Sequence, residues 1–275
     1  MGAPGSSPDP VTSMQIMDFT VKIFADGADV DGIRAMSAQP WIRGFTTNPT
    51  LMRKAGVGDY RRFAHEVLEI ARNRPVSFEV FADDFDEMER QAREIASWGA
   101  NVNVKIPVTN TRRQFAGPLI NRLAREGVAV NVTAVFTLDQ VKAITTQLAD
   151  DTPAIISIFA GRIADTGVDP VPVMRESLRI MEARPRAELL WASPRELLNI
   201  VQANEIGCHI ITVTGDLLAK LPLLGRSHDD YSLETVEMFH RDAVAAGYTV
   251  TPAAHATSRS RLSPTAPVRS KESAS

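Results

Sequence analysis

The chain has 275 residues, of which 44% are hydrophobic, so it can bury a large core as a single domain. Its formal net charge of −3 gives no general electrostatic reason to expect nucleic acid or an anionic membrane as partner. No apolar run approaches the roughly 20 residues of a membrane span. The single cysteine, Cys208, excludes an internal disulfide and a cysteine-clustered zinc site.

The two ends differ in composition from the rest of the chain. Residues 1–18 are rich in Gly, Ser and Pro and lack the basic and apolar stretches of a secretory signal. Residues 251–275 contain mainly Ser, Ala, Pro and Arg without periodicity, and are mildly basic. We therefore expect disordered extensions at 1–18 and 251–275 around one folded domain at 19–250, and a cytoplasmic protein. An inert C-terminal tail is favoured over a docking or nucleic-acid role.

Between the ends, short β-rich runs alternate with stretches of helical periodicity. The predicted strands are 21–27, 43–49, 76–82, 102–108, 128–136, 154–161, 187–193 and 209–215. The most regular helical stretches are 59–73, 84–99, 169–184 and 193–207. Acidic residues open 84–99 and Gly99 closes it, while Pro194 suits the first turn of 193–207.

Eight strands, each followed by a helix in one domain of this length, predict an α/β fold, the (β/α)8 TIM barrel. An open doubly wound sheet is the alternative. It would usually have fewer strands and often a glycine-rich first turn, and FADGADVDG is not such a turn.

One lysine lies inside a predicted strand that otherwise reads as buried. In NVNVKIPV, residues 101–108, every second residue is Val or Ile, and Lys105 belongs to the alternating set with two asparagines and a proline. In a parallel barrel, one face of each strand meets the helices and the other meets the lumen. If the branched side chains pack on helices, Lys105 points into the barrel.

Other predicted strands place polar side chains near their carboxyl ends. These residues are Asp26, Thr46, Asn48, Glu79, Asn131, Thr133 and Ser157. Active sites of this fold lie at that end of the barrel. Polar groups from six strands, including one amine and two carboxylates, therefore predict a site built around Lys105. A purely structural polar network is the alternative.

The chemistry expected of such a lysine is Schiff-base formation. Desolvation favours the neutral, nucleophilic form of an amine, which can condense with a carbonyl substrate. The iminium then serves as an electron sink for breaking or making a carbon–carbon bond. Asp26 and Glu79 are the carboxylates available for proton transfer. The alternative is that Lys105 has only a structural role and forms a salt bridge with one of these carboxylates.

Five motifs resemble those of a known family. GFTTNPTLMRKAG (44–56) resembles the second-strand signature of transaldolases and the related fructose-6-phosphate aldolases, and NVNVKIPVT (101–109) resembles their lysine strand. NVTAVF (131–136), FAGRIAD (159–165) and WASPRE (191–196) are similar to the later strands in the same order. The similarity covers about residues 20–225, and the combination of motifs is highly specific.

The resemblance implies a role for each catalytic candidate. Lys105 would be the Schiff-base nucleophile, and Asp26 would take the proton from the hydroxyl whose carbon leaves as aldehyde. Glu79 would move protons through a water that Thr133 positions. The enzyme would act in carbohydrate metabolism, as transaldolases of the pentose phosphate pathway do.

The resemblance also implies where the substrate binds. The candidates for its hydroxyls are Asn48, Asn131 and Ser157, with Thr46 and Phe159 beside them; Arg162, Ser193 and Arg195 would hold a sugar phosphate. Guanidinium groups offer forked donors to phosphate, and residues 193–195 are expected to open a helix. The alternative to phosphate binding is that Arg162 and Arg195 are ordinary surface arginines at strand ends.

Two positions favour a transaldolase over an aldolase. Glu79 and Phe159 are transaldolase-like, because the similar aldolases carry glutamine and tyrosine there. The compact core instead resembles the short branch that contains those aldolases, so aldolase activity is the runner-up. Gly27, where the family often has a hydroxyl residue, and a bulky Trp191 expected on the lumenal face leave the exact substrate open.

The remaining expectations concern partners and competing functions. The resemblance implies a homo-oligomer acting on small sugar phosphates, without metal or other cofactor, because the iminium does the electrophilic work. A non-catalytic sugar-phosphate binder is the second function class, and it would not need Lys105 together with both carboxylates. A Schiff-base aldolase from another barrel family would carry its lysine on strand six rather than strand four.

Overall fold

The computed structural model describes residues 18–250, so the expectations for 1–17 and 251–275 lie outside the described residues. The chain divides into two compact units, residues 1–226 and 227–275, and each is considered by itself. None of the helices within 18–250 combines the length and apolar character that a membrane crossing requires.

The first unit is built on eight parallel strands that close into a barrel in sequence order. The strands are β1 (Lys22–Asp26), β2 (Ile42–Thr46), β3 (Val76–Glu79), β4 (Val102–Pro107), β5 (Val130–Val135), β6 (Ala154–Ile158), β7 (Ala187–Trp191) and β8 (Ile210–Thr214). Each predicted strand is present, and the predicted (β/α)8 TIM barrel is confirmed.

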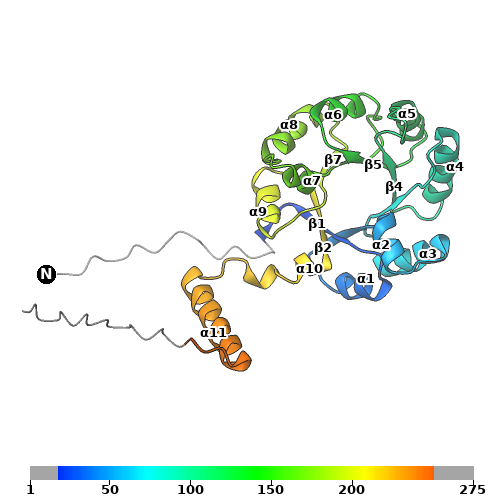
Figure 1. Cartoon of the computed structure of the whole chain (residues 1–275). Coiled ribbons are helices and arrows are strands. Elements are labelled where there is room, and N and C mark those ends of the chain that lie inside the picture. Colours follow the sequence, from blue (N-terminus) through cyan, green and yellow to red (C-terminus); the bar gives the residue numbers. More distant parts are fainter. Residues whose placement is uncertain (1–17, 251–275) are drawn as a thin grey trace, which may run out of the picture. The chain divides into compact units, whose positions relative to one another are not determined.

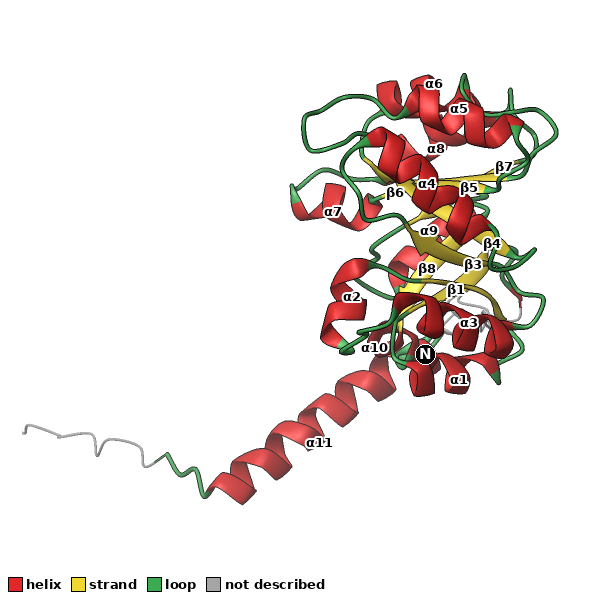
Figure 2. Cartoon of the chain, turned by 90° about the vertical axis from the view of Figure 1, so that its right-hand side faces the viewer, coloured by secondary structure: helices red, strands yellow, loops and turns green. Residues whose placement is uncertain are grey.

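Helices surround the strands (Figure 1). They are α1 (Val30–Ser37), α2 (Pro49–Lys54), α3 (Tyr60–Ala71), α4 (Phe85–Ala96), α5 (Gly117–Arg125), α6 (Leu138–Thr145), α7 (Ala160–Asp165), α8 (Val171–Met181), α9 (Leu198–Glu205) and α10 (Gly215–Leu218), followed by the 3-10 helix η2 (Leu221–Leu223). The short helices α2 and α7 follow directly on β2 and β6, and they lie at the same end of the barrel (Figure 2). That end is where the strands have their carboxyl termini.

Two helix boundaries differ from the prediction. The helix expected over 193–207 begins only at Leu198, so Pro194 is not in its first turn. Ser193 adopts φ 62°, a left-handed conformation that a helical residue cannot have. The helix expected over 84–99 is capped by Asp84, as its acidic start suggested, but it ends at Ala96 before Gly99.

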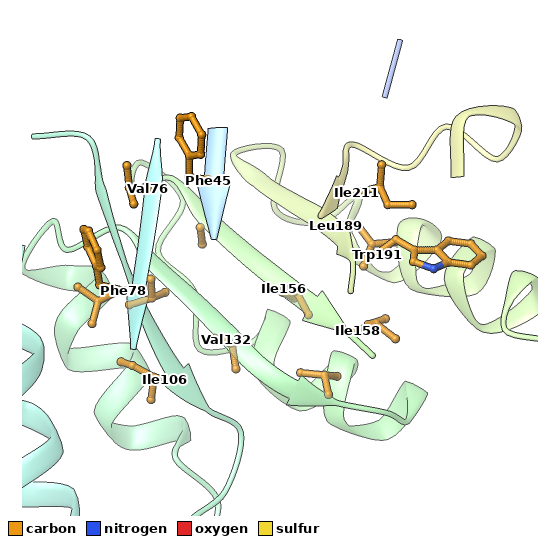
Figure 3. Close-up of a cluster of buried hydrophobic side chains, with 14 of the residues drawn as sticks. Phe45, Val76, Phe78, Ile106, Val132, Ile156, Ile158, Leu189, Trp191 and Ile211 are labelled. Atoms are coloured by element: carbon orange, nitrogen blue, oxygen red, sulfur yellow. The ribbon is translucent and has the colours of Figure 1, made fainter. Parts of the chain in front are cut away.

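Side chains on the outer face of the strands form the main hydrophobic core. Phe78, Ile106, Val132 and Trp191 belong to one buried cluster (Figure 3). The expectation that Trp191 faces the lumen is therefore wrong. The alternation within β7 runs the other way, because Leu190 belongs to a separate buried cluster on the opposite face from Leu189 and Trp191.

A second buried cluster fills the inside of the barrel. It contains Phe24, Ile155, Leu190, Ala192 and Ile210. The ring of Phe24 requires a residue without a side chain on the neighbouring strand, because a Cβ at Gly44 would lie 2.6 Å from that ring. The glycine of the GFTTNP motif is thus explained by packing against β1.

The second unit contains the 19-residue helix α11 (His228–Ala246). Ser227 caps its start by accepting a hydrogen bond from the Asp230 N–H, and Gly247 ends it in the left-handed conformation with φ 67°. No residue within α11 is buried.

Candidate active site

A cavity of about 570 Å³ lies at the carboxyl-terminal end of the barrel. The predicted site residues that line it are Asp26, Thr46, Asn48, Glu79, Lys105, Thr133, Ser157, Phe159, Arg162, Ser193 and Arg195. Asn131 is the exception. The structure therefore brings together residues that the sequence spreads over 170 positions.

Lys105 lies in the wall of this cavity with its amine buried. The residue is 7% exposed. Its Nζ donates a hydrogen bond to the backbone oxygen of Thr47 at 2.8 Å and lies 3.2 Å from Glu79 Oε2. Glu79 and Lys105 are paired across β3 and β4, so the strand register itself sets this contact. The ion pair weighed as an alternative is thus present, and it lies inside the cavity.

Asp26 is the second carboxylate of the site. Thr46 Oγ1 donates to its Oδ1 at 2.8 Å, and Asn48 Nδ2 approaches its Oδ2 at 3.4 Å. Burial raises the pKa of Asp26 above its ordinary value, because desolvation outweighs the opposing attraction of Lys105 and the two hydrogen bonds. A buried carboxyl group of this kind is a stronger base than an exposed one.

The orientation of Asn48 follows from helix capping. Asn48 is the N-cap of α2, and its Oδ1 accepts a hydrogen bond from the Leu51 N–H at 2.9 Å. With its oxygen committed to the cap, the amide nitrogen of Asn48 is turned toward Asp26. Pro49, which follows, suits the first helical position. The TNP motif therefore both starts a helix and directs a donor into the site.

Asn131 lies behind the cavity wall and is fully buried. Its Nδ2 donates to Ser77 Oγ at 3.0 Å, and its Oδ1 accepts from Ser157 Oγ at 2.6 Å. Ser157 lines the cavity, so Asn131 connects it to the buried Ser77. In the structure, Asn131 supports Ser157 through this hydrogen bond. Direct contact between Asn131 and a substrate stays a prediction.

Thr133 lines the cavity and has a hydroxyl without a partner. Its Oγ1 is buried and has no hydrogen-bond partner among the described residues. The next residue, Ala134, adopts φ 58°, and the pairing of β5 with β6 shifts between Val132 and Val135. This irregularity lies directly beside Thr133. An unpaired buried hydroxyl is costly, and a polar group beside Thr133 would satisfy it.

The three candidates for phosphate binding line the cavity, and the two arginines among them are held differently. The Arg162 guanidinium lies over the Phe159 ring, 5.2 Å from its centre. Arg195 forms a forked ion pair with Asp165, with Nε 2.9 Å from Oδ1 and a second contact to Oδ2. Asp165 is about half exposed. Arg195 can therefore reach an anion only in competition with this carboxylate.

Close packing fixes the two segments that carry these arginines. A Cβ at Gly161 would lie 1.5 Å from the backbone oxygen of Ser193, so no other residue fits there without moving the chain. The Gly161 N–H also donates to the Ala192 oxygen at 3.3 Å. The start of α7 and the loop after β7 thus lie directly against each other.

The sequence reasoning missed two groups of cavity residues. The first is on β8 and the start of α10: Thr212, Thr214 and Asp216. The alternation ITVT in 211–214 carried this signal, since Thr212 and Thr214 occupy the same parity as the polar residues of other strands. The second group has side chains that carry no charge and gave no chemical signal: Pro49, Thr50, Leu51, Ala134, Leu190, Ala192 and Pro194.

Tyr60 is a further residue beside the site, and its place there is set by the structure. It lies on α3, yet its hydroxyl accepts from the Glu79 N–H at 2.8 Å and donates to the Glu79 backbone oxygen at 3.1 Å. Burial raises the pKa of Tyr60, so the phenol stays protonated at physiological pH. Tyr60 therefore fixes the end of β3, from which the Glu79 side chain projects.

Within residues 18–250, no three His, Cys, Asp or Glu side chains gather in a way that could hold a metal ion. The site instead combines one buried amine, two nearby carboxylates, hydroxyl and amide groups, and two arginines in a single cavity. This set is suited to addition of an amine to a carbonyl group followed by proton transfers.

Comparison with known proteins shows which family this chain resembles. The family model "Transaldolase/Fructose-6-phosphate aldolase" matches residues 23–259. A probable transaldolase from Dehalococcoides mccartyi is 35% identical over 202 residues, which are 73% of this chain and 90% of that protein. A probable transaldolase from Streptococcus agalactiae is also 35% identical over 202 residues, covering 73% of this chain and 89% of that protein.

Among solved structures, a crystal structure of 2,3-dimethylmalate lyase, a PEP mutase/isocitrate lyase superfamily member, matches with a TM-score of 0.50 and 13% identity. It covers 88% of this chain and 89% of that chain, and at this identity it shows the fold alone. The match of the family model over most of the chain and the identity to the two relatives show more than the fold. The chain belongs to the transaldolase/fructose-6-phosphate aldolase family.

Proposed function

We propose that this protein is a Schiff-base transaldolase that transfers a dihydroxyacetone unit from a ketose phosphate to an aldose acceptor. The observation that carries the proposal is the position of Lys105. Its amine is buried, lies 3.2 Å from Glu79 Oε2, and lines the same cavity as Asp26. Family membership supports sugar phosphates as the substrate class.

Formation of the Schiff base would use Lys105 and Glu79. Glu79 accepts a proton from the Lys105 ammonium, and the neutral amine attacks the carbonyl carbon of the ketose. After a proton moves from nitrogen to oxygen, the carbinolamine holds a hydroxyl that must leave as water. Glu79 returns its proton to this hydroxyl, and an iminium joins Lys105 to the substrate. The distance between Lys105 Nζ and Glu79 Oε2 allows transfer directly or through one water.

Cleavage and transfer would use Asp26. Asp26 takes the proton of the hydroxyl on the carbon that leaves, the carbon–carbon bond breaks toward the iminium, and an aldehyde departs. A three-carbon enamine stays on Lys105 and attacks the carbonyl carbon of the acceptor. Asp26 then gives its proton to the new hydroxyl, and water hydrolyses the iminium. The raised pKa of Asp26 suits a group that must keep the proton between the two half-reactions.

The arginines would bind the phosphate of donor and acceptor. Arg162 and Arg195 line the cavity together with Ser193, and guanidinium groups match phosphate oxygens with forked hydrogen bonds. Glu79 and Phe159 support transfer rather than simple aldol cleavage, because the resemblance associates these two residue types with transaldolases. A homo-oligomer is part of the same proposal.

The experiment that tests the proposal is trapping of the Schiff base. The full chain is mixed with fructose 6-phosphate and borohydride, with and without erythrose 4-phosphate, and its intact mass and peptides are measured. We expect a reduced three-carbon adduct on Lys105 that diminishes when the acceptor aldehyde is present. Release of free dihydroxyacetone without acceptor, at a rate equal to that of transfer, would instead indicate an aldolase.

Two variants make the trapping result specific. Lys105→Met should give no adduct, whereas Lys142→Met removes an exposed lysine on α6 and should give the wild-type adduct. No adduct with fructose 6-phosphate or with a panel of other ketose phosphates would contradict the proposal and favour a non-catalytic binder. An adduct that maps to a different lysine would contradict the assignment of Lys105.

A further inference from the structure

Two threonine hydroxyls form a chain of hydrogen bonds that ends at Asp26. Thr46 on β2 donates to Asp26 Oδ1 at 2.8 Å. Thr212 on β8 contacts the same Thr46 hydroxyl through its own hydroxyl. Strands β2 and β8 flank β1, so the barrel closure brings the two threonines together beside Asp26. Thr46 is 3% and Thr212 is 6% exposed, and bulk solvent therefore has little access to the pair.

The direction of the hydrogen bonds in this chain follows from counting protons. A threonine hydroxyl has one proton to donate, and an ionised carboxylate only accepts. When Asp26 is ionised, the Thr46 proton is used by Asp26. The bond between the two hydroxyls must then be donated by Thr212 and accepted by Thr46. Each bond in such a series polarises the next, which strengthens the donation to the carboxylate.

We infer that Thr212 is a positioning residue for Asp26: its hydroxyl holds the Thr46 hydroxyl in the orientation that donates to Oδ1. Oδ2, which Asn48 approaches at 3.4 Å, is then the oxygen left to take the substrate proton. The inference rests on the proposed function in one respect, namely that Asp26 is the base of the reaction. The contact between Thr212 and Thr46 stands apart from that assumption.

Thr212 has no charge, so its effect must be separated from that of the charged groups around Asp26. Lys105 on β4 favours the ionised carboxylate, and Glu79 on β3 disfavours it. Asp216, another carboxylate of the cavity, is hydrogen-bonded by Thr214. The cavity arginines, Arg162 and Arg195, are on α7 and on the loop after β7. Changing Thr212 leaves all of these charges in place, and so isolates the contribution of the hydroxyl chain.

The test compares variants that remove or keep the hydroxyl. Thr212→Val removes the hydroxyl at nearly constant shape, and Thr212→Ser keeps it. We expect Thr212→Val to lower kcat about 3- to 10-fold, the effect of one net hydrogen bond. Loss of the donor destabilises ionised Asp26, so the acid limb of the pH–kcat profile should move up by about half a pH unit. Thr212→Ser should restore both values.

Two further variants serve as control and replacement in this test. Thr152→Val removes another buried threonine hydroxyl, which bonds the Ala124 oxygen at 2.8 Å away from the cavity, and should leave the acid limb unchanged. If Thr212→Val does not fold, Thr212→Ala gives the same comparison. An unchanged acid limb in the variant that lacks the hydroxyl, or failure of the serine variant to restore it, would overturn the inference.

Failure of the inference can be distinguished from failure of the proposed function. The ¹³C carboxyl signal of Asp26 can be titrated by NMR in the wild type and in Thr212→Val without any substrate. A higher titration midpoint in the variant supports the inference even if borohydride traps no adduct. Trapping on Lys105 together with equal midpoints would uphold the function and reject the role of Thr212.

Discussion

The inside of the barrel holds two sets of side chains that differ in polarity and in the interactions that hold them together. The polar set comes from β1 to β6 and β8, and hydrogen bonds and one ion pair link most of its members; it contains Asp26, Thr46, Ser77, Glu79, Lys105, Asn131, Thr133, Ser157 and Thr212. The apolar set comes from β1, β6, β7 and β8 and is the buried cluster of Phe24, Ile155, Leu190, Ala192 and Ile210. Strands β1, β6 and β8 contribute to both sets.

The difference shows how one lumen can serve stability and chemistry together. The apolar set removes hydrocarbon from water, which stabilises the fold. The polar set places an amine and two carboxylates where water has limited access, which opposes folding unless these groups are paired. The polar set therefore depends on the apolar set, and substitutions in the two sets should have opposite signatures. Four predictions follow from this contrast, in order of decreasing effect.

Lys105→Met should separate activity from stability most completely. We expect transfer to fall by more than about 10⁴-fold, because the group that forms the covalent bond is lost. The unfolding midpoint should fall far less than activity does: Glu79 loses its partner, but it lines the cavity, where water can hydrate its carboxylate. Steady-state kinetics and thermal unfolding measure the two quantities. Lys142→Met is the matched control, and equal activity in both variants would remove Lys105 from the reaction.

Asp26→Asn should lower activity but raise stability. Transfer should fall about 10²- to 10⁴-fold with the loss of the base. The pKa of Asp26 is raised in the folded state, so folded protein binds this proton more tightly than unfolded protein does. Stability contributed by Asp26 therefore falls as the pH rises from its ordinary value of 3.8 through the raised pKa. The asparagine variant should have a higher Tm than wild type at pH 7.

The pH series for Asp26→Asn supplies its own control. Below the ordinary pKa, the carboxyl group is protonated in both the folded and the unfolded state, so the gain in Tm should vanish as the pH approaches that value. A variant that is less stable than wild type at pH 7 would show that the hydrogen bonds that Asp26 accepts outweigh its desolvation.

Ile210→Ala should show the opposite signature from the polar set. Ile210 is fully buried in the apolar set and does not line the cavity. We expect the free energy of unfolding to drop by about 2–5 kcal/mol, through lost burial and the cavity left behind, while kcat is retained. Urea denaturation measures this change. Leu233→Ala removes an exposed leucine of α11 and should change the free energy by less than about 0.5 kcal/mol.

Asp165→Asn should have the smallest effect on activity, because Asp165 contacts the site through Arg195. The variant frees Arg195 from its ion pair, so the KM of a phosphorylated donor should fall about 2- to 3-fold at low salt. The gain should shrink as salt is added. Glu176→Gln breaks a similar forked pair with Arg179 on α8 and should leave KM unchanged. A higher KM in Asp165→Asn would mean that Asp165 orients Arg195 for the phosphate.

Much of the polar set could be predicted because alternation along a strand is a local property. Lys105, Glu79 and Thr133 could each be placed from the parity of their own strand, and parallel closure then brought them to one end. Thr212 has the same parity signal, but a hydroxyl without a charged neighbour in sequence does not indicate its contact with Thr46. That contact exists only because the first and last strands are joined.

Two errors in the prediction lie at the end of β7. The positive φ of Ser193 is incompatible with a helix, so the helix expected from residue 193 begins only at Leu198. Trp191 was placed on the wrong face because alternation along a short strand does not by itself say which of its two faces is lumenal. The ion pair between Arg195 and Asp165 was equally out of reach, since it joins the loop after β7 to α7. The limits of the folded domain stay a prediction.

The two acceptors around the Lys105 amine set a condition on any covalent intermediate. An ammonium has three N–H donors, and two partners, the Thr47 oxygen and the Glu79 carboxylate, lie within reach of it. An iminium nitrogen keeps a single N–H, so it can serve only one of the two. The acceptor that is released needs a new donor, and the hydroxyl groups of a bound sugar can provide one. Carbonyl compounds without a neighbouring hydroxyl would leave that acceptor unsatisfied, and the loss would discriminate against them before any carbon–carbon bond is broken.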